Sequence, residues 1–136
     1  MAATPLAPNS IGNMIFAPGA TNTDTGITAF AGGGQASATL LTAQFNKVAT
    51  VATIADSVKL PPITPVPFAL ASIAPSTHVI VRNAGANSVQ VFGSGTDTIN
   101  DVATATGVAV AAGKTAIFYP HSLISGVGNW YMVLSA

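Results

Sequence analysis

The sequence predicts an all-β protein: an antiparallel, jelly-roll-like sandwich preceded by an extended N-terminal arm. Three observations lead to this prediction. From residue 36 onwards, short runs of β-branched and aromatic residues recur. Turn clusters that contain Gly and Asn separate these runs at the spacing of about 8–12 residues that is typical of sandwiches and barrels. In the first 35 residues, Pro and Gly are too frequent for a helix.

Residues 1–35 are the predicted arm, and residues 36–136 are the predicted sandwich domain. One short strand is expected in the arm, around Ile11–Phe16. Large apolar side chains are too numerous here for a free tail, so the arm should lie on its own domain or on a neighbouring subunit. We favour the neighbour, which would make the arm a clamp. The expected partner contacts are Ile11, Met14, Ile15, Phe16, Ile27 and Phe30.

The segment Ala36–Val58 allows two interpretations. Its many Ala residues favour a helix, whereas its many Thr, Val and Ile residues favour strands, and the run Val48–Ile54 is ambiguous in period. β-branched side chains lose χ1 freedom in a helix. We therefore predict strands in this segment.

The second half of the chain has the clearest strand pattern. His78–Arg82 and Ser88–Phe92 flank a turn cluster at Asn83–Asn87, which predicts a hairpin. A Gly turn at Gly113 separates two further β-patterned runs, and Trp130–Leu134 is the last predicted strand. The side chains predicted to be buried between the two sheets are Val79, Val81, Val89, Val91, Ile117, Trp130 and Met132.

The composition excludes several classes of protein. Charged residues make up only 6% of the chain, against about 25% in an ordinary soluble domain, which excludes disorder driven by charge. Four Lys and Arg residues are too few to neutralise a nucleic-acid backbone. Cys is absent, which excludes disulfides and thiolate metal sites. No apolar run reaches the ~20 residues of a spanning helix, so we expect no membrane as a partner. Because of the few Lys and Arg residues, we expect no nucleic acid as a partner either.

The charge balance also predicts association. The formal net charge is zero, and proteins with net charge near zero tend to associate. We expect a homo-oligomer, either a dimer or a trimer, packed into a larger assembly. The alternative is a neutral domain that Thr and Asn side chains keep in solution.

One motif comes close to the phosphate-binding P-loop. That motif reads G-x-x-x-x-G-K-[ST] and opens a helix after a strand. In this chain five residues separate Gly107 from Gly113, one too many, and Lys114 opens a β-patterned run. We therefore interpret the motif as a glycine turn with a surface lysine.

Other candidate sites are equally incomplete. Asp97 and Asp101 supply two carboxylates without EF-hand spacing, whereas calcium takes six to eight oxygens. His78 and His121 lack the spacing of a zinc motif, and the nucleophile elbow G-x-S-x-G is absent. We predict no catalytic, cofactor-binding or metal-binding residue, no cofactor, and no enzyme activity.

The aromatic residues have two interpretations. They could form a platform on which a sugar or a base stacks, or they could fill the core. Aromatic side chains dominate cores through their large buried area, so we favour the core for all of them: Phe92, Phe118, Tyr119, Trp130 and Tyr131.

A series of short motifs runs from Ala36 to Leu134. They occur at Ala38–Thr42, Val48–Val51, Asp56–Pro61, Val81–Asn83, Gly85–Gly93, Gly95–Asn100, Ala112–Thr115 and Gly128–Tyr131. Their order, V-x-N-x-G-A-N-x-x-Q-V, then G-x-D-x-I-N, then Gly-Lys-Thr and a final G-x-W, resembles that in the capsid decoration (cement) proteins of tailed bacteriophages. The arm lies outside this resemblance.

The resemblance implies a jelly-roll-like β-sandwich in the virion, on the outer surface of the capsid, whose partner is the major capsid protein. It implies no catalytic residues. The alternative is a head-fibre, tail or receptor-binding component of the virion, although no repeat or heptad shaft is visible in the sequence. A third interpretation is an enzyme or small-molecule binder, for which a ligand pocket at His78 or Asp97 would be the sign.

Overall fold

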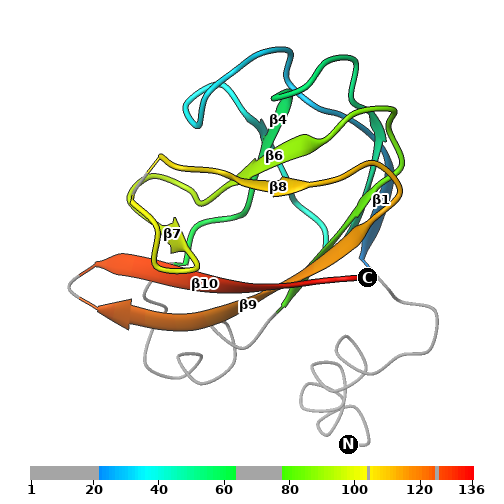
Figure 1. Cartoon of the computed structure of the whole chain (residues 1–136). Coiled ribbons are helices and arrows are strands. Elements are labelled where there is room, and N and C mark those ends of the chain that lie inside the picture. Colours follow the sequence, from blue (N-terminus) through cyan, green and yellow to red (C-terminus); the bar gives the residue numbers. More distant parts are fainter. Residues whose placement is uncertain (1–21, 64–77, 104, 125) are drawn as a thin grey trace, which may run out of the picture.

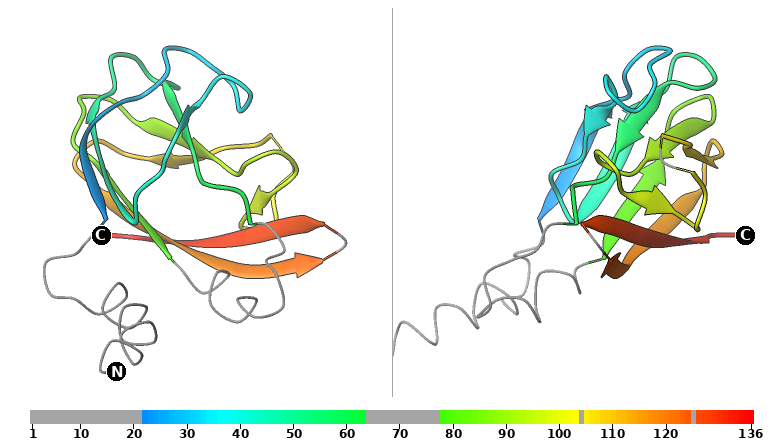
Figure 2. Two further views of the ribbon diagram at one scale, coloured as in Figure 1. Left: turned by 180° about the vertical axis from the view of Figure 1, so that it is seen from behind. Right: turned by 90° about the vertical axis from the view of Figure 1, so that its left-hand side faces the viewer.

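The computed structural model of the chain describes residues 22–63, 78–103, 105–124 and 126–136. This part of the chain contains strands and turns but no helix, and its strands form two sheets (Figures 1 and 2). The all-β prediction is therefore confirmed. The strands are β1 (Thr23–Thr28), β2 (Thr39–Leu40), β3 (Phe45–Thr50), β4 (Ser57–Lys59), β5 (Val79–Asn83), β6 (Val89–Phe92), β7 (Thr98–Ile99), β8 (Val108–Val110), β9 (Thr115–Ile124) and β10 (Val127–Leu134).

The chain alternates between the two sheets. The six-stranded sheet has the order β1-β3-β5-β9-β10-β7, and the four-stranded sheet has the order β2-β4-β6-β8. Each described strand from β1 to β8 is thus followed by a strand in the opposite sheet, whereas β10 lies in the same sheet as its predecessor β9. The chain winds through the sandwich as a flattened coil, in which β1 and β2 form the first turn.

The winding corrects the prediction of an antiparallel sandwich. Among the described strands, five pairings are parallel (β1–β3, β3–β5, β2–β4, β4–β6 and β7–β10) and three are antiparallel (β5–β9, β9–β10 and β6–β8). A chain that crosses to the other sheet after every strand returns to the first sheet in its original direction. The first three turns of the coil, from β1 to β6, therefore pair in parallel, whereas β8 and β9 run antiparallel to β6 and β5.

The same winding shows that the predicted hairpin is wrong. β5 and β6 occupy different sheets, and the loop between them, Ala84–Ser88, crosses the sandwich. The Gly113 turn likewise joins β8 in one sheet to β9 in the other. A short turn cluster can span the roughly 10 Å between stacked sheets as readily as it closes a hairpin, and the strand periodicity is the same in both cases. Among the described strands, only β9 and β10 pair with a sequential neighbour.

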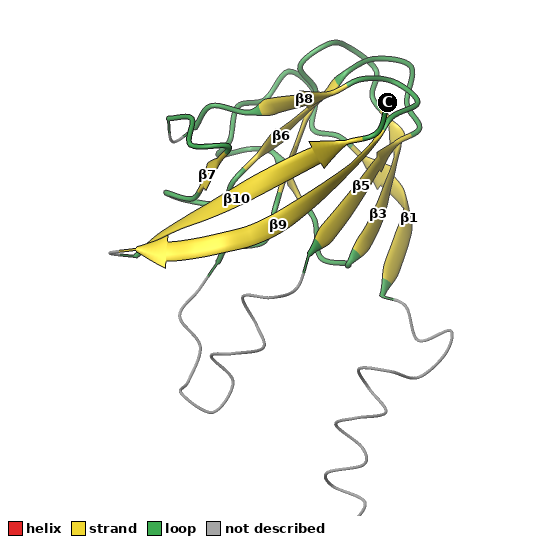
Figure 3. Cartoon of the chain, turned by 60° about the horizontal axis from the view of Figure 1, so that its bottom comes forward, coloured by secondary structure: helices red, strands yellow, loops and turns green. Residues whose placement is uncertain are grey.

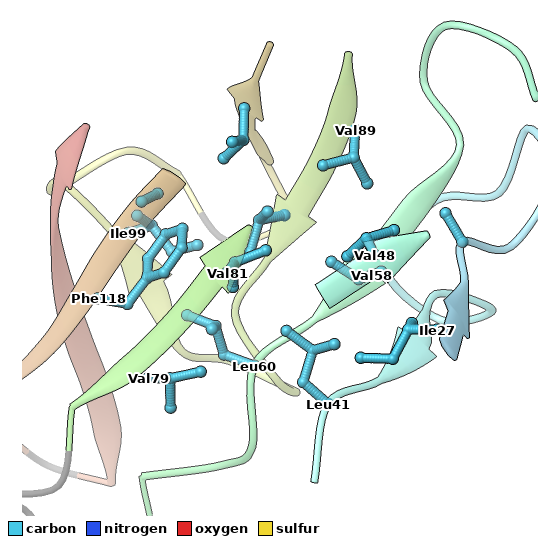
Figure 4. Close-up of a cluster of buried hydrophobic side chains, with 14 of the residues drawn as sticks. Ile27, Leu41, Val48, Val58, Leu60, Val79, Val81, Val89, Ile99 and Phe118 are labelled. Atoms are coloured by element: carbon cyan, nitrogen blue, oxygen red, sulfur yellow. The ribbon is translucent and has the colours of Figure 1, made fainter. Parts of the chain in front are cut away.

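The core lies between the two sheets (Figure 4). The prediction of strands in residues 36–58 is confirmed by β2, β3 and β4. Five of the seven predicted core residues are buried: Val79, Val81, Val89, Val91 and Trp130. Met132 is partly buried against the same cluster. Ile117 was wrongly predicted, because its neighbours Ala116 and Phe118 fill the core and period-two alternation turns Ile117 to the other face of β9.

Buried polar side chains hold the crossings of the coil together at one end. Asp56, before β4, accepts hydrogen bonds from the amides of Gly32 (3.0 Å), Ala52 (2.8 Å) and Thr53 (3.0 Å), and from the Thr53 hydroxyl (2.6 Å). The Asp56 carboxylate thus joins the β1–β2 crossing to the β3–β4 crossing. These donors, the Thr53 hydroxyl first among them, lower the pKa of Asp56 to about 2.

Asparagines continue these links to the next crossings. The side-chain amide of Asn87 donates hydrogen bonds to the backbone carbonyls of Val51 (3.1 Å) and Ala52 (2.8 Å). The buried Asn83 side chain donates to the carbonyls of Asn87 and Val110, both at 2.8 Å. Side-chain hydrogen bonds therefore join the β1–β2, β3–β4 and β5–β6 crossings to one another and to the end of β8. These bonds satisfy backbone groups that the strand ladders leave free.

At the other end of the sandwich, Asp97 plays a similar role. Its buried carboxylate accepts the amides of Ile63 (2.8 Å) and Gly128 (2.9 Å). A Cβ atom on Gly128 would stand 2.6 Å from both Asp97 Oδ1 and Ile63 Cβ. Glycine is therefore required at this position of β10 by close approach.

The described residues also revise the boundary of the arm. β1 begins at Thr23 and pairs with β3, so the end of the predicted 1–35 segment is part of the six-stranded sheet. Ile27 on β1 is 7% exposed and belongs to the core, which makes it unavailable as a partner contact. The other expected contacts except Phe30, and the expected strand at Ile11–Phe16, lie outside the described residues.

Candidate functional site

The candidate metal-binding and catalytic residues do not come together in one site in the described part of the chain. Asp97 is buried and engaged with backbone amides, whereas Asp101 is exposed. His78 and His121 each lie against a different tyrosine ring. In the described part of the chain, no group of three or more His, Asp or Glu residues could hold a metal ion. The expectation of no metal site and no catalytic site remains a prediction.

The near-match to a P-loop has a structural use. Residues between its two glycines form β8, which pairs with β6. Gly113 adopts a φ of 78°, the left-handed region that favours glycine, and its amide donates to the Asn83 carbonyl at 2.9 Å. This amide is not free to cradle a phosphate.

Two exposed regions at opposite edges of the six-stranded sheet remain as candidates. β1 is the outermost described strand at one edge, and β7, next to β10, is outermost at the other. Figure 1 shows this separation, with β1 and β7 on opposite sides of the molecule.

The first region, which we call the β1–β2 edge, consists of β1, β2 and Phe30. Phe30 and Leu40 are each 46% exposed. The backbones of Phe30 and Ser57 exchange two hydrogen bonds, each of 2.9 Å, and Leu40 pairs with Lys59. Both residues therefore lie along the side of β4 that faces away from β6. The hydroxyl of Thr39 donates to the Thr28 carbonyl at 2.9 Å and joins β2 to β1.

Phe30 is held in place by its own loop. Its ring lies over Gly33, where an added Cβ would meet Phe30 Cδ1 at 2.3 Å. One side of the ring therefore packs on the backbone of its own loop, while the side chain as a whole remains 46% exposed. Phe30 is the one expected partner contact that the described structure leaves accessible.

The second region is on the outer face of the six-stranded sheet, seen in Figure 3, where no described segment crosses in front of β9 and β10. Strand register places apolar side chains side by side in a row across four strands, from Phe45 through Ile80 and Ile117 to Val133. Val133 is 57% exposed.

Beside this row lie the two tyrosines. Tyr119 on β9 is directly opposite Tyr131 on β10. The Tyr119 side chain is 45% exposed. The His121 ring meets the Tyr131 ring nearly edge-on, with centroids 4.8 Å apart and planes at 80°, and His78 lies 6.0 Å from Tyr119.

A polar network borders the tyrosines. Asp101 accepts hydrogen bonds from the Tyr131 hydroxyl (2.8 Å) and from the Asn129 side-chain amide (2.5 Å). The Thr98 hydroxyl donates to Asn129 Oδ1 at 3.0 Å. The bond to Asp101 is the main cause that raises the pKa of Tyr131 above its usual value of 10.0. We call Tyr119, Tyr131, His121, Asp101 and Asn129 the tyrosine cluster.

The tyrosine cluster was missed because the aromatic residues were assigned to the core together. Phe118, Phe92 and Trp130 are buried, as expected. Tyr119 and Tyr131 each follow a buried aromatic residue directly in sequence, so alternation along the strand turns them outward. This alternation was the available signal.

No protein-family model, curated protein or solved structure matches the chain. Within the described ranges, no helix is long and apolar enough to cross a membrane.

Proposed function

We propose that the chain is a structural protein of a tailed-phage virion, which decorates the outside of the head and stabilises contacts between major capsid protein subunits. The observation that carries the proposal is the β1–β2 edge, where Phe30 and Leu40 expose large apolar side chains. A jelly-roll-like fold belongs to the same proposal and is supported only by the two-sheet sandwich.

Apolar burial is the expected source of the attachment energy. Burying a Phe or Leu side chain contributes about 1.5–3 kcal/mol. Many copies on one lattice, or an oligomer that touches several capsid subunits, gain further through multivalency. Since the net charge is zero, attachment should depend little on salt.

The test uses heads of the encoding phage that were assembled without this chain. We expect the wild-type protein to co-sediment with these heads and to raise their resistance to heat. The variant Phe30→Ser with Leu40→Ser should lose most of the binding. Ile54→Ser is the matched control, because Ile54 is exposed but lies in the turn before Asp56, outside the β1–β2 edge.

Each outcome has a defined meaning. Failure of the wild-type protein to bind heads contradicts decoration. Binding of the double variant at the wild-type level contradicts the β1–β2 edge as the contact. Labelling of intact virions at the tail or at fibres, rather than over the head surface, would favour the alternative of a fibre, tail or receptor-binding component.

A further inference from the structure

We infer that the tyrosine cluster is a binding site for a neutral saccharide. This inference goes beyond the proposed function. The cluster lies on β9 and β10, near the edge of the six-stranded sheet opposite to the β1–β2 edge. Attachment through the β1–β2 edge would therefore leave the tyrosine cluster accessible.

The two tyrosines supply the surface on which a sugar ring can stack. Tyr119 and Tyr131 project from directly opposite positions of neighbouring strands, where Cβ atoms stand about 4.5–5.5 Å apart. Both phenol side chains therefore start from neighbouring positions on the same face of the sheet, where one saccharide could contact both. Tyrosine offers a rigid apolar face and a polar tip at low cost in conformational entropy.

Asp101 and Asn129 supply the hydrogen bonds. A carboxylate has about four acceptor positions, and only two donors reach Asp101 among the described contacts. Asp101 is exposed, so its remaining lone pairs can accept hydrogen bonds from sugar hydroxyls. Hydrogen bonds to a charged acceptor are about twice as strong as neutral ones.

The network also fixes the geometry before any ligand arrives. Asp101 holds the hydroxyl of Tyr131 and the amide of Asn129, and His121 lies edge-on against Tyr131. A site whose side chains are already ordered loses less entropy when it binds. This order distinguishes the cluster from a scatter of exposed aromatic residues.

Charge distinguishes a neutral saccharide from other ligands. Asp101 places a negative charge within the cluster, which disfavours phosphates and acidic sugars. The Lys and Arg residues on this face, Lys47 and Arg82, share a register row that ends at Thr115, away from the tyrosines. The Arg82 guanidinium also donates to the Gly113 carbonyl.

The test measures binding of the full-length protein in solution to an array of neutral oligosaccharides that contain glucose, galactose, mannose or N-acetylglucosamine. We expect at least one of them to bind with a dissociation constant in the millimolar range or below. Tyr119→Ala should weaken this binding by roughly ten-fold, as expected for the loss of one stacking contact. Asp101→Asn should weaken it while leaving the fold intact.

Val133→Ala is the matched control, since Val133 is exposed on the same face of β10 but lies outside the cluster. Near-ultraviolet circular dichroism of the buried Trp130 shows whether each variant is folded. The inference is overturned if no neutral oligosaccharide binds, if only acidic ones bind, or if both Tyr119→Ala and Asp101→Asn bind as the wild type does. Loss of head binding in Tyr119→Ala without any saccharide binding would instead identify a protein contact. The measurement uses the free protein, so failure of the decoration proposal would not affect it.

Discussion

The backbone amide of Gly32 donates a hydrogen bond to Asp56 Oδ1 at 3.0 Å, across 24 residues of sequence. This bond joins the first turn of the coil to the second, and it is one of four that the same carboxylate accepts. All four favour the charged form of Asp56, so the link between the turns depends on pH.

The Asp56 carboxylate should therefore make the free energy of unfolding depend on pH in the acid range. Its folded pKa of about 2 lies below the ordinary value of 3.8, so the charged carboxylate stabilises the fold fully above the ordinary value. This contribution is lost as the pH falls through the folded pKa. Urea unfolding measured at several pH values should show that Asp56→Asn loses less stability than the wild type between pH 4 and pH 2. Equal losses in the two proteins would contradict the role given to the carboxylate.

Gly128→Ala should destabilise the protein by about 1–3 kcal/mol, the usual cost of overpacking. The added methyl group would stand 2.6 Å from Asp97 Oδ1 and from Ile63 Cβ. Gly34→Ala is the control, because a Cβ atom there would meet no atom within 4 Å. Thermal unfolding of both variants tests the difference, and equal midpoints would show that the chain relaxes around Gly128 at no cost.

Trp130→Ala should cost about 3–5 kcal/mol, because Trp130 is buried in the core. Its Nε1–H has no hydrogen-bond partner in the described part of the chain. Trp130→Phe should therefore cost less than Trp130→Ala, since it keeps most of the apolar contact and removes an unpaired donor. Chemical denaturation gives both values. A Phe variant as unstable as the Ala variant would indicate a polar role for the indole.

Two truncations should separate the arm from the sandwich. Removal of residues 1–21 leaves every described strand in place, and we expect cooperative unfolding to persist. Removal of residues 1–30 also deletes β1 with the buried Ile27, which alone contributes about 1.5–3 kcal/mol. If residues 1–21 act as the expected clamp, the shorter truncation should bind heads poorly while it remains folded. Undiminished head binding would argue against the clamp.

The Asp101–Tyr131 bond should be visible in a titration. Asp101 raises the pKa of Tyr131, so Asp101→Asn should shift one tyrosine ionisation to lower pH. The hydrogen-bonded phenol stabilises the fold below its ordinary pKa of 10.0, and this contribution is lost as the pH rises through the folded pKa. Ultraviolet absorbance of tyrosinate measures the shift, and identical curves would mean that the bond is absent in solution.

Local sequence predicted the strands well and their pairing poorly. Val79, Val81, Val89 and Val91 were correctly assigned to the core because period-two alternation is a property of each strand alone. Whether β6 returns beside β5 or crosses to the other sheet depends on contacts between residues far apart in sequence. Asn87 reaches back to Val51 and Ala52, and no local pattern encodes that choice.

The candidate sites divide in the same way. Phe30 and Ile27 were both expected as partner contacts; Phe30 is exposed and could make such a contact, whereas Ile27 lies in the core. The sequence marks Ile27 only as apolar, and its pairing opposite Val48 decides its burial. In the tyrosine cluster, Asp101 comes from the turn after β7 and binds Asn129 and Tyr131 of β10, so the polar half of the cluster depends on tertiary structure.

The alternation of strands between the sheets also has a kinetic consequence. Among the described strands, β9 and β10 are the one pair joined by a short turn, so only this pair can form as a local hairpin. Every other pair must first close a loop that contains at least one strand of the opposite sheet, and loop closure costs entropy before contacts compensate for it. Proteins dominated by such distant contacts refold in about milliseconds to seconds. Refolding should therefore be slow, with the β9–β10 hairpin acquiring hydrogen-exchange protection before the first turn of the coil does.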